Sequence, residues 1–64
     1  MYQTFVVTDL TGQRVRFGEI NQSVPVPITR DPNRPCTVKV ANEYCADFID
    51  AVRDQGWSHR LITE

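Results

Sequence analysis

Cys45 and His59 are the two residues whose types could form a catalytic pair. The first turn of a helix can activate a cysteine thiol, and a histidine can serve as its base. Cys45, however, falls on the apolar side of the helix predicted around it, and nothing in the sequence brings His59 near it. We therefore expect a small buried cysteine, a partly exposed histidine, and a protein that is not an enzyme.

The residues needed for a metal or nucleotide site do not occur at recognised spacings. The chain has two cysteines, Cys36 and Cys45, no C-x-x-C pair and a single histidine, which are too few ligands for a zinc site. Gly12, Gly18 and Gly56 stand apart, so none belongs to a glycine-rich phosphate loop. We expect no metal and no cofactor, and two free, mostly buried thiols in the reducing cytoplasm.

Charge is the most specific feature of the sequence. Residues 1–42 carry five basic and three acidic side chains, whereas residues 43–64 carry two basic and five acidic ones. The acidic side chains of the second part recur at helical spacing and predict one charged helix face. This face would be solvated or would bind a basic partner, and it comprises Glu43, Asp47, Asp50 and Asp54.

Basic side chains alternate with apolar ones in the segments that read as strands. If a helix covers the apolar face of the sheet, the opposite face becomes basic. That face would be an ordinary wet surface or a docking surface for an acidic protein or single-stranded nucleic acid. It comprises Arg14, Arg16, Lys39 and Arg60.

One helix must organise these faces. Residues 43–55 place Tyr44, Cys45, Phe48, Ile49 and Val52 on one side of a helical wheel and the acidic residues on the other. The preceding asparagine is a favoured N-cap, and the glycine after the helix suits a left-handed C′ position. The tryptophan that follows would contact the last apolar turn of the helix.

Strands account for most of the remaining chain. Residues 2–9 are rich in aromatic and β-branched side chains, and residues 13–20 alternate, with Val15 and Phe17 on one face. A turn at residues 10–12 would join them into a hairpin. Residues 36–41 and 57–63 read as two further strands.

Residues 21–35 contain all four prolines. Pro25 and Pro27 would leave one side of a strand without donors, so residues 24–29 read as a protected edge strand or as an open loop. An Asp-Pro pair at residues 31–32 favours a type I turn. A polyproline ligand is the less favoured alternative, because the spacing is P-x-P.

The order β-β-β-β-α-β predicts one α+β domain over residues 1–64. It has two layers, with one helix on a mainly antiparallel sheet of four or five strands. No apolar run exceeds three residues, which argues against a membrane span. The expected core comprises Phe5, Val7, Val15, Phe17, Val38, Val40, Tyr44, Phe48, Val52, Trp57 and Leu61.

These features predict a small, non-catalytic, cytoplasmic protein that acts through protein–protein contacts. Adaptors, antitoxin-like regulators and inhibitors encoded by mobile elements share this size and build, by analogy only. A nucleic-acid-binding regulator that uses the basic face is an alternative, although the net charge of −1 gives nucleic acid little general attraction. Self-association is the third possibility, through opposite charges or through pairing of the last strand.

Overall fold

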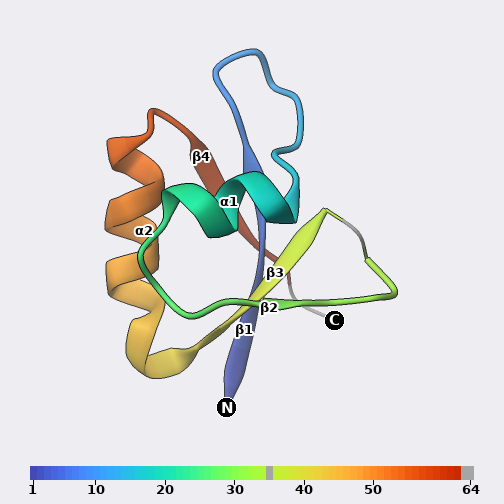
Figure 1. Cartoon of the computed structure of the whole chain (residues 1–64), viewed down its shortest axis with the longest axis vertical. Helices are drawn as coiled ribbons and strands as arrows, with labels where there is room; N and C mark the ends of the chain where they lie inside the picture. The colour runs from blue at the N-terminus through green and yellow to red at the C-terminus, as the bar shows by residue number, and fades with distance from the viewer. Residues whose placement is uncertain (35, 63–64) are drawn as a thin grey trace.

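The computed structural model describes residues 1–34 and 36–62, and these form an antiparallel sheet with two helices against one face (Figure 1). The α+β fold of two layers is therefore confirmed. No helix within these residues has the length and apolar character needed to cross a membrane. In chain order the elements are β1 (Tyr2–Thr8), α1 (Phe17–Ser23), β2 (Thr29–Arg30), β3 (Thr37–Ala41), the 3₁₀ turn η1 (Asn42–Tyr44), α2 (Cys45–Asp54) and β4 (Ser58–Ile62).

Strand β1 lies at the centre of the sheet. The described strands are ordered β2-β3-β1-β4, and every neighbouring pair is antiparallel. Phe5 lies opposite Val38 of β3 and Leu61 of β4, whereas the next residue, Val6, lies opposite Thr37 and Arg60. Because successive side chains point to opposite faces, Phe5 faces the helices and Val6 faces away from them.

The core lies between the sheet and both helices. Phe5 packs against Phe48 of α2, with ring centroids 5.2 Å apart. Helix α1 adds Ile20, which is fully buried. The buried cluster comprises Phe5, Val7, Val15, Ile20, Val24, Val26, Val38, Val40, Phe48 and Val52.

The turn after β1 forms as predicted and is held by Asp9. Its Oδ1 accepts hydrogen bonds from the Thr11 hydroxyl at 2.6 Å and from the N–H groups of Thr11 and Gln13. The hydroxyl bond is the main reason why the pKa of Asp9 is lowered. Because this pKa is lowered, the ionised Asp9 side chain stabilises the folded turn at pH values above the usual carboxyl pKa. This stabilisation is lost as the pH falls through the pKa of Asp9 in the folded state.

The predicted strand over residues 13–20 is wrong. Only Arg14 pairs with β1, as an isolated bridge to Thr8, and the chain then enters α1. Phe17, Ile20 and Val24 follow the i, i+3, i+7 spacing of a helix face, and burial of Ile20 and Val24 against the sheet decides in favour of the helix. The element order of the described residues is therefore β-α-β-β-α-β.

Residues 24–29 were predicted to form an edge strand or an open loop, and only Thr29 of this segment belongs to the edge strand β2. Val24 and Val26 are buried while Pro25 and Pro27 are exposed, so the alternation is real. Pairing with β3 begins only at β2, which has two residues. The turn at residues 31–34 is confirmed, because the Arg34 N–H donates to the Asp31 carbonyl at 3.1 Å. Residue 35 and the predicted last strand residue, 63, lie outside the described part of the chain.

The end of the long helix is confirmed and its start is not. The Gly56 N–H donates to the Arg53 carbonyl and the Trp57 N–H to the Val52 carbonyl, the two bonds of a Schellman stop. At the other end, Asn42 begins a 3₁₀ turn, and its side chain caps neither η1 nor α2. Tyr44 and Leu61 were expected in the core, but they are 37% and 46% exposed.

Replacing Gly56 by alanine should destabilise the fold by about 1–2 kcal/mol, because its φ of +79° is a left-handed conformation that disfavours a Cβ atom. The nearest atom to that Cβ would be in the Leu10 side chain at 3.8 Å, so the cost comes from the backbone alone. Gly18→Ala is the matched control. Gly18 lies in α1 with open space around it, and its replacement by alanine should raise the free energy of unfolding by about 0.5–1 kcal/mol. Urea unfolding measures the free energy of unfolding of both variants. A change of the same sign in the two variants would contradict this account.

Candidate functional site

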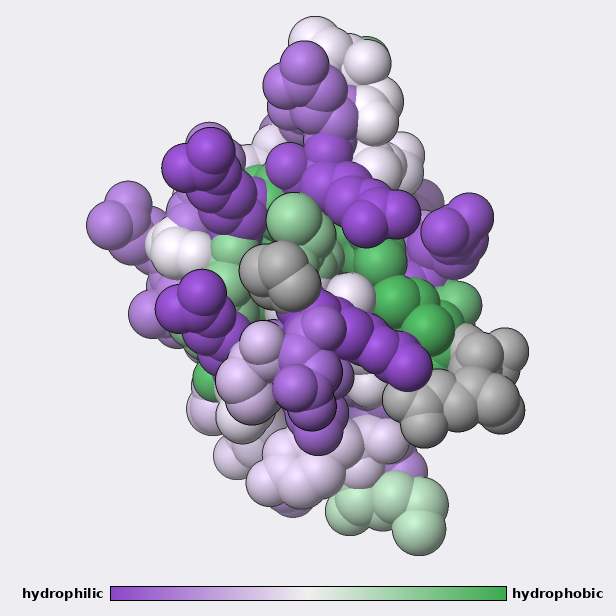
Figure 2. Space-filling model, turned by 90° about the vertical axis from the view of Figure 1, so that its right-hand side faces the viewer, coloured by the Kyte–Doolittle hydropathy of each residue, from purple (hydrophilic) through white to green (hydrophobic). Residues whose placement is uncertain are grey.

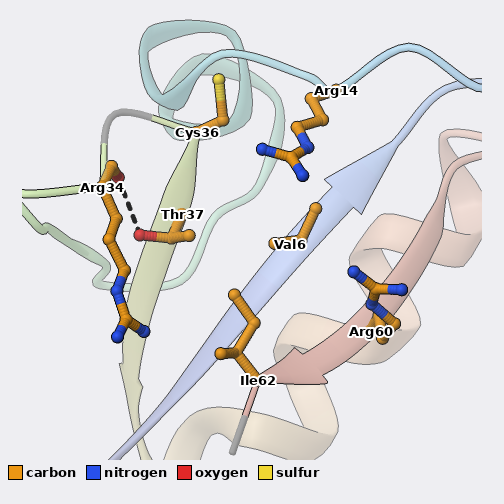
Figure 3. A pocket seen from close by; sticks show the side chains of 7 residues that line it. All are labelled: Val6, Arg14, Arg34, Cys36, Thr37, Arg60 and Ile62. Carbon is orange, nitrogen blue, oxygen red and sulfur yellow. Dashed lines mark hydrogen bonds between the residues drawn. The ribbon is translucent and has the colours of Figure 1, made fainter. Parts of the chain in front are cut away.

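The face of the sheet that points away from the helices, here called the outer face, contains a hollow of about 360 Å³. Val6, Cys36, Thr37 and Ile62 line it. Three arginines line it as well, Arg14, Arg34 and Arg60, and we call it the basic hollow. In Figure 3, Val6 and Ile62 lie between Arg34 on the left and Arg60 on the right, with Arg14 above them.

The sheet residues that line the basic hollow between its arginines include two that are buried, Val6 and Thr37. Val6 and Thr37 are each only 5% exposed, although they face away from the helices. Figure 2 shows hydrophobic side chains on one side of the molecule with strongly hydrophilic ones around them. The long stems of arginine side chains can cover such aliphatic surface while their guanidinium groups stay in water.

Arg14 and Arg60 reach the hollow from elements next to β1. Arg14 is placed by its bridge to Thr8, immediately after the turn, and Arg60 by its position opposite Val6 in the β1–β4 ladder. Both side chains are exposed. Both were predicted on the basic face from the alternation of the sequence, and the structure places them around the same hollow.

Arg34 was missed by the sequence reasoning. The Thr37 N–H and hydroxyl both donate to the Arg34 carbonyl, at 3.0 and 2.8 Å, which ties the turn to the start of β3 (Figure 3). The Asn33 N–H donates to the Asp31 side chain within the same turn. The signal was present in the sequence: a predicted Asp-Pro turn leading directly into a strand puts its last residue beside that strand.

The electrostatics of the basic hollow favour an anion. No residue that lines it, among those described, carries a carboxylate. Guanidinium groups bind carboxylates and phosphates through paired, charge-assisted hydrogen bonds. The combination of Arg14 and Arg60 with the apolar side chains of Val6 and Ile62 suits an acidic ligand that also has an apolar part.

The structure separates the other two residues of the predicted basic face from the hollow. Arg16 precedes α1 and lines a second hollow of about 510 Å³, together with Glu19 and Arg30. Arg16 was placed on the outer face only because residues 13–20 were read as a strand. Lys39 is on the outer face, opposite Thr4, but it does not line the basic hollow.

The predicted acidic face is on the surface. Asp47, Asp50 and Asp54 are exposed on α2 and line a third hollow of about 370 Å³, whose other walls include Tyr44 and the Pro25–Pro27 segment. Glu43 is exposed in η1 and lies outside this hollow. The carboxylates are thus accessible, and the prolines form a wall that the helical wheel did not predict.

The possible catalytic pair is not assembled as a nucleophile and base. The Cys45 thiol donates weakly to the carbonyl oxygens of Ala41 and Val40, at 3.4 and 3.8 Å. His59 packs edge-on against the Phe5 ring. Both cysteines are free and half-buried. No group of three or more histidine, cysteine or acidic side chains in residues 1–34 and 36–62 could hold a metal ion.

Comparison with known proteins adds no further information on function. No protein-family model matches the chain, and no curated protein or solved structure matches it either. The chemistry of the surfaces described above is therefore the basis for a functional proposal.

Proposed function

We propose that this is a small, non-catalytic, cytoplasmic binding protein whose basic hollow accepts an acidic segment of another protein. The observation that carries the proposal is that Arg14 and Arg60, from separate parts of the chain, line one hollow together with the apolar side chains of Val6 and Ile62. Arginine is enriched among residues that dominate protein interfaces, where it pairs with carboxylates. Adaptors and inhibitors are the protein types that such a surface suits.

Single-stranded nucleic acid is the competing ligand, because phosphates also bind arginine. Proteins that bind it on a sheet face stack bases on aromatic side chains. The basic hollow has no aromatic residue among its described lining, and Tyr2, although exposed, lies near the far end of β1. An acidic protein segment therefore suits the hollow better.

The double change Arg14→Glu and Arg60→Glu should weaken partner binding at least about tenfold, because it replaces two attractive charges by two repulsive ones. The tagged protein captures partners from lysate of the native host, with and without nuclease, and far-UV circular dichroism confirms folding. The matched control is Asp47→Lys with Asp50→Lys, which also changes two charges, but on α2.

Three outcomes would contradict the proposal. The first is a captured protein that binds the arginine variant as well as it binds the unchanged chain. The second is a complex that nuclease treatment abolishes, which would favour the nucleic-acid alternative. The third is loss of capture only in the aspartate variant, which would move the binding surface to α2.

A further inference from the structure

The two edges of the sheet differ in how well they are protected. The β2 edge is two residues long and follows Pro25 and Pro27, which have no N–H to offer. The β4 edge is five residues long and contains no proline. Proteins usually block a sheet edge that could pair with another chain. Among the described residues, no strand pairs with the outer side of β4, so this edge is the part of the sheet that can accept a further strand.

The hydrogen bonds of β1 show which way the backbone groups of its residues point. The Val7 carbonyl accepts the Val15 N–H, and the Asp9 N–H donates to the Gln13 carbonyl, both at 2.8 Å and both on the β3 side. At the other end of β1, the Met1 carbonyl accepts the Asn42 N–H, also on the β3 side. Odd-numbered residues thus bond towards β3.

Even-numbered residues of β1 must then bond towards β4, because backbone groups alternate along an antiparallel strand. The register of the β1–β4 ladder is unbroken from Thr4↔Ile62 to Thr8↔Ser58. The N–H and C=O groups of Arg60, which lies opposite Val6, therefore form hydrogen bonds with β1. His59 and Leu61 direct theirs to the open side, where no described residue forms a backbone hydrogen bond with them.

Basic and apolar side chains both lie beside this edge. Arg60 is on the outer face, where it and Ile62 line the basic hollow. Leu61 points to the helix side and is 46% exposed, so part of its apolar surface is free for contact. A strand beside β4 would place one side chain opposite Arg60 and the next on the side of Leu61.

The position of Arg60 disfavours one register in which a second copy of this chain could be the added strand. Two β4 strands could pair about a two-fold axis so that His59 of each copy bonds with Leu61 of the other. That register uses all the free edge groups, but it sets Arg60 opposite Arg60, and like charges directly opposite are destabilising. A carboxylate opposite Arg60 is favourable instead.

We infer that an extended segment with alternating acidic and apolar residues adds to β4 as a fifth strand. Its backbone bonds to the N–H and C=O groups of His59 and Leu61, an acidic side chain pairs with Arg60, and an apolar one covers Leu61. Strand addition of this kind draws affinity from the main chain and specificity from alternate side chains. The inference rests on the proposed function and specifies how the acidic partner binds.

A peptide titration tests the inference with the full chain labelled with ¹⁵N. The probe is a nine-residue peptide of alternating valine and glutamate, blocked at both ends, and the matched control replaces each glutamate by lysine. At millimolar concentration the glutamate peptide should slow amide hydrogen exchange at His59 and Leu61 at least about tenfold, whereas the lysine peptide should not.

Two variants make the test specific. Leu61→Pro removes an N–H that points away from β1 and leaves the ladder to β1 intact, so it should weaken peptide binding at least about tenfold. Leu61→Ala keeps this N–H, so the peptide should still protect most of the same amides from exchange. Arg60→Glu should reverse the preference, so that the lysine peptide binds better. The second variant keeps the test decisive if the proline variant does not fold.

Several results would overturn the inference. Binding that leaves His59 and Leu61 unprotected would show that the ligand occupies only the basic hollow, and the proposed function would then stand without strand addition. No binding of the glutamate peptide would reject the edge as its site. Protection that grows with protein concentration in the absence of peptide would identify a second copy as the strand.

Discussion

Phe48→Ala should cost about 3–5 kcal/mol of folding free energy, the usual effect of removing a buried aromatic side chain. Phe48 is fully buried and contacts the Phe5 ring, so its loss leaves a cavity where α2 meets the centre of the sheet. A chain of 64 residues buries only about 60% of its unfolded surface and has little stability to lose. Most molecules of the variant should therefore be unfolded at about 37 °C.

Urea unfolding followed by tryptophan fluorescence measures this change, because Trp57 is packed against the same core. Tyr44→Ala is the matched control, since it removes an aromatic ring that is 37% exposed just before the same helix. It should cost less than about 1 kcal/mol. Equal effects of the two substitutions would show that Phe48 is not a core residue.

Ile20→Ala should be the second most damaging change, at about 2–5 kcal/mol. Ile20 is the buried residue of α1 and has no exposed surface. A helix of seven residues is not stable alone, so α1 depends on this contact with the sheet. Loss of the side chain should loosen α1 and the Val24–Val26 segment that follows it.

Hydrogen exchange resolves this second effect along the chain. Amides of α1 should lose protection more strongly than those of β1 in the Ile20 variant. Leu10→Ala is the control, because it removes a similar aliphatic side chain that is 87% exposed. Unchanged stability of the Ile20 variant would mean that α1 does not depend on this residue.

Local patterns in the sequence predicted elements whose stability depends on their own residues. The helix around Phe48 has a wide apolar side and a glycine at the position where a left-handed residue is needed, and both features are visible without a structure. The turns at Asp9 and Asp31 rest on side chains that bond to their own backbone. For the same reason the acidic residues of the helix could be assigned to its surface.

Residues 13–20 were misread as a strand because two patterns coexist there. Val15 and Phe17 alternate like a strand, while Phe17, Ile20 and Val24 recur like a helix face. Neither pattern is long enough to decide between strand and helix from the local sequence. Contact with the sheet stabilises the helix, and that contact joins residues far apart in the chain.

The sequence alone determined the fold class and the long helix with its acidic side, because the patterns that define these elements lie in residues that are neighbours in the chain. Only the tertiary structure decided that Arg34 joins Arg14 and Arg60 while Arg16 does not, and that β4 is the edge strand of the described sheet. Those properties depend on which strands pair and in which register. Such pairing is set by the packing of the whole core, so no single segment contains the information.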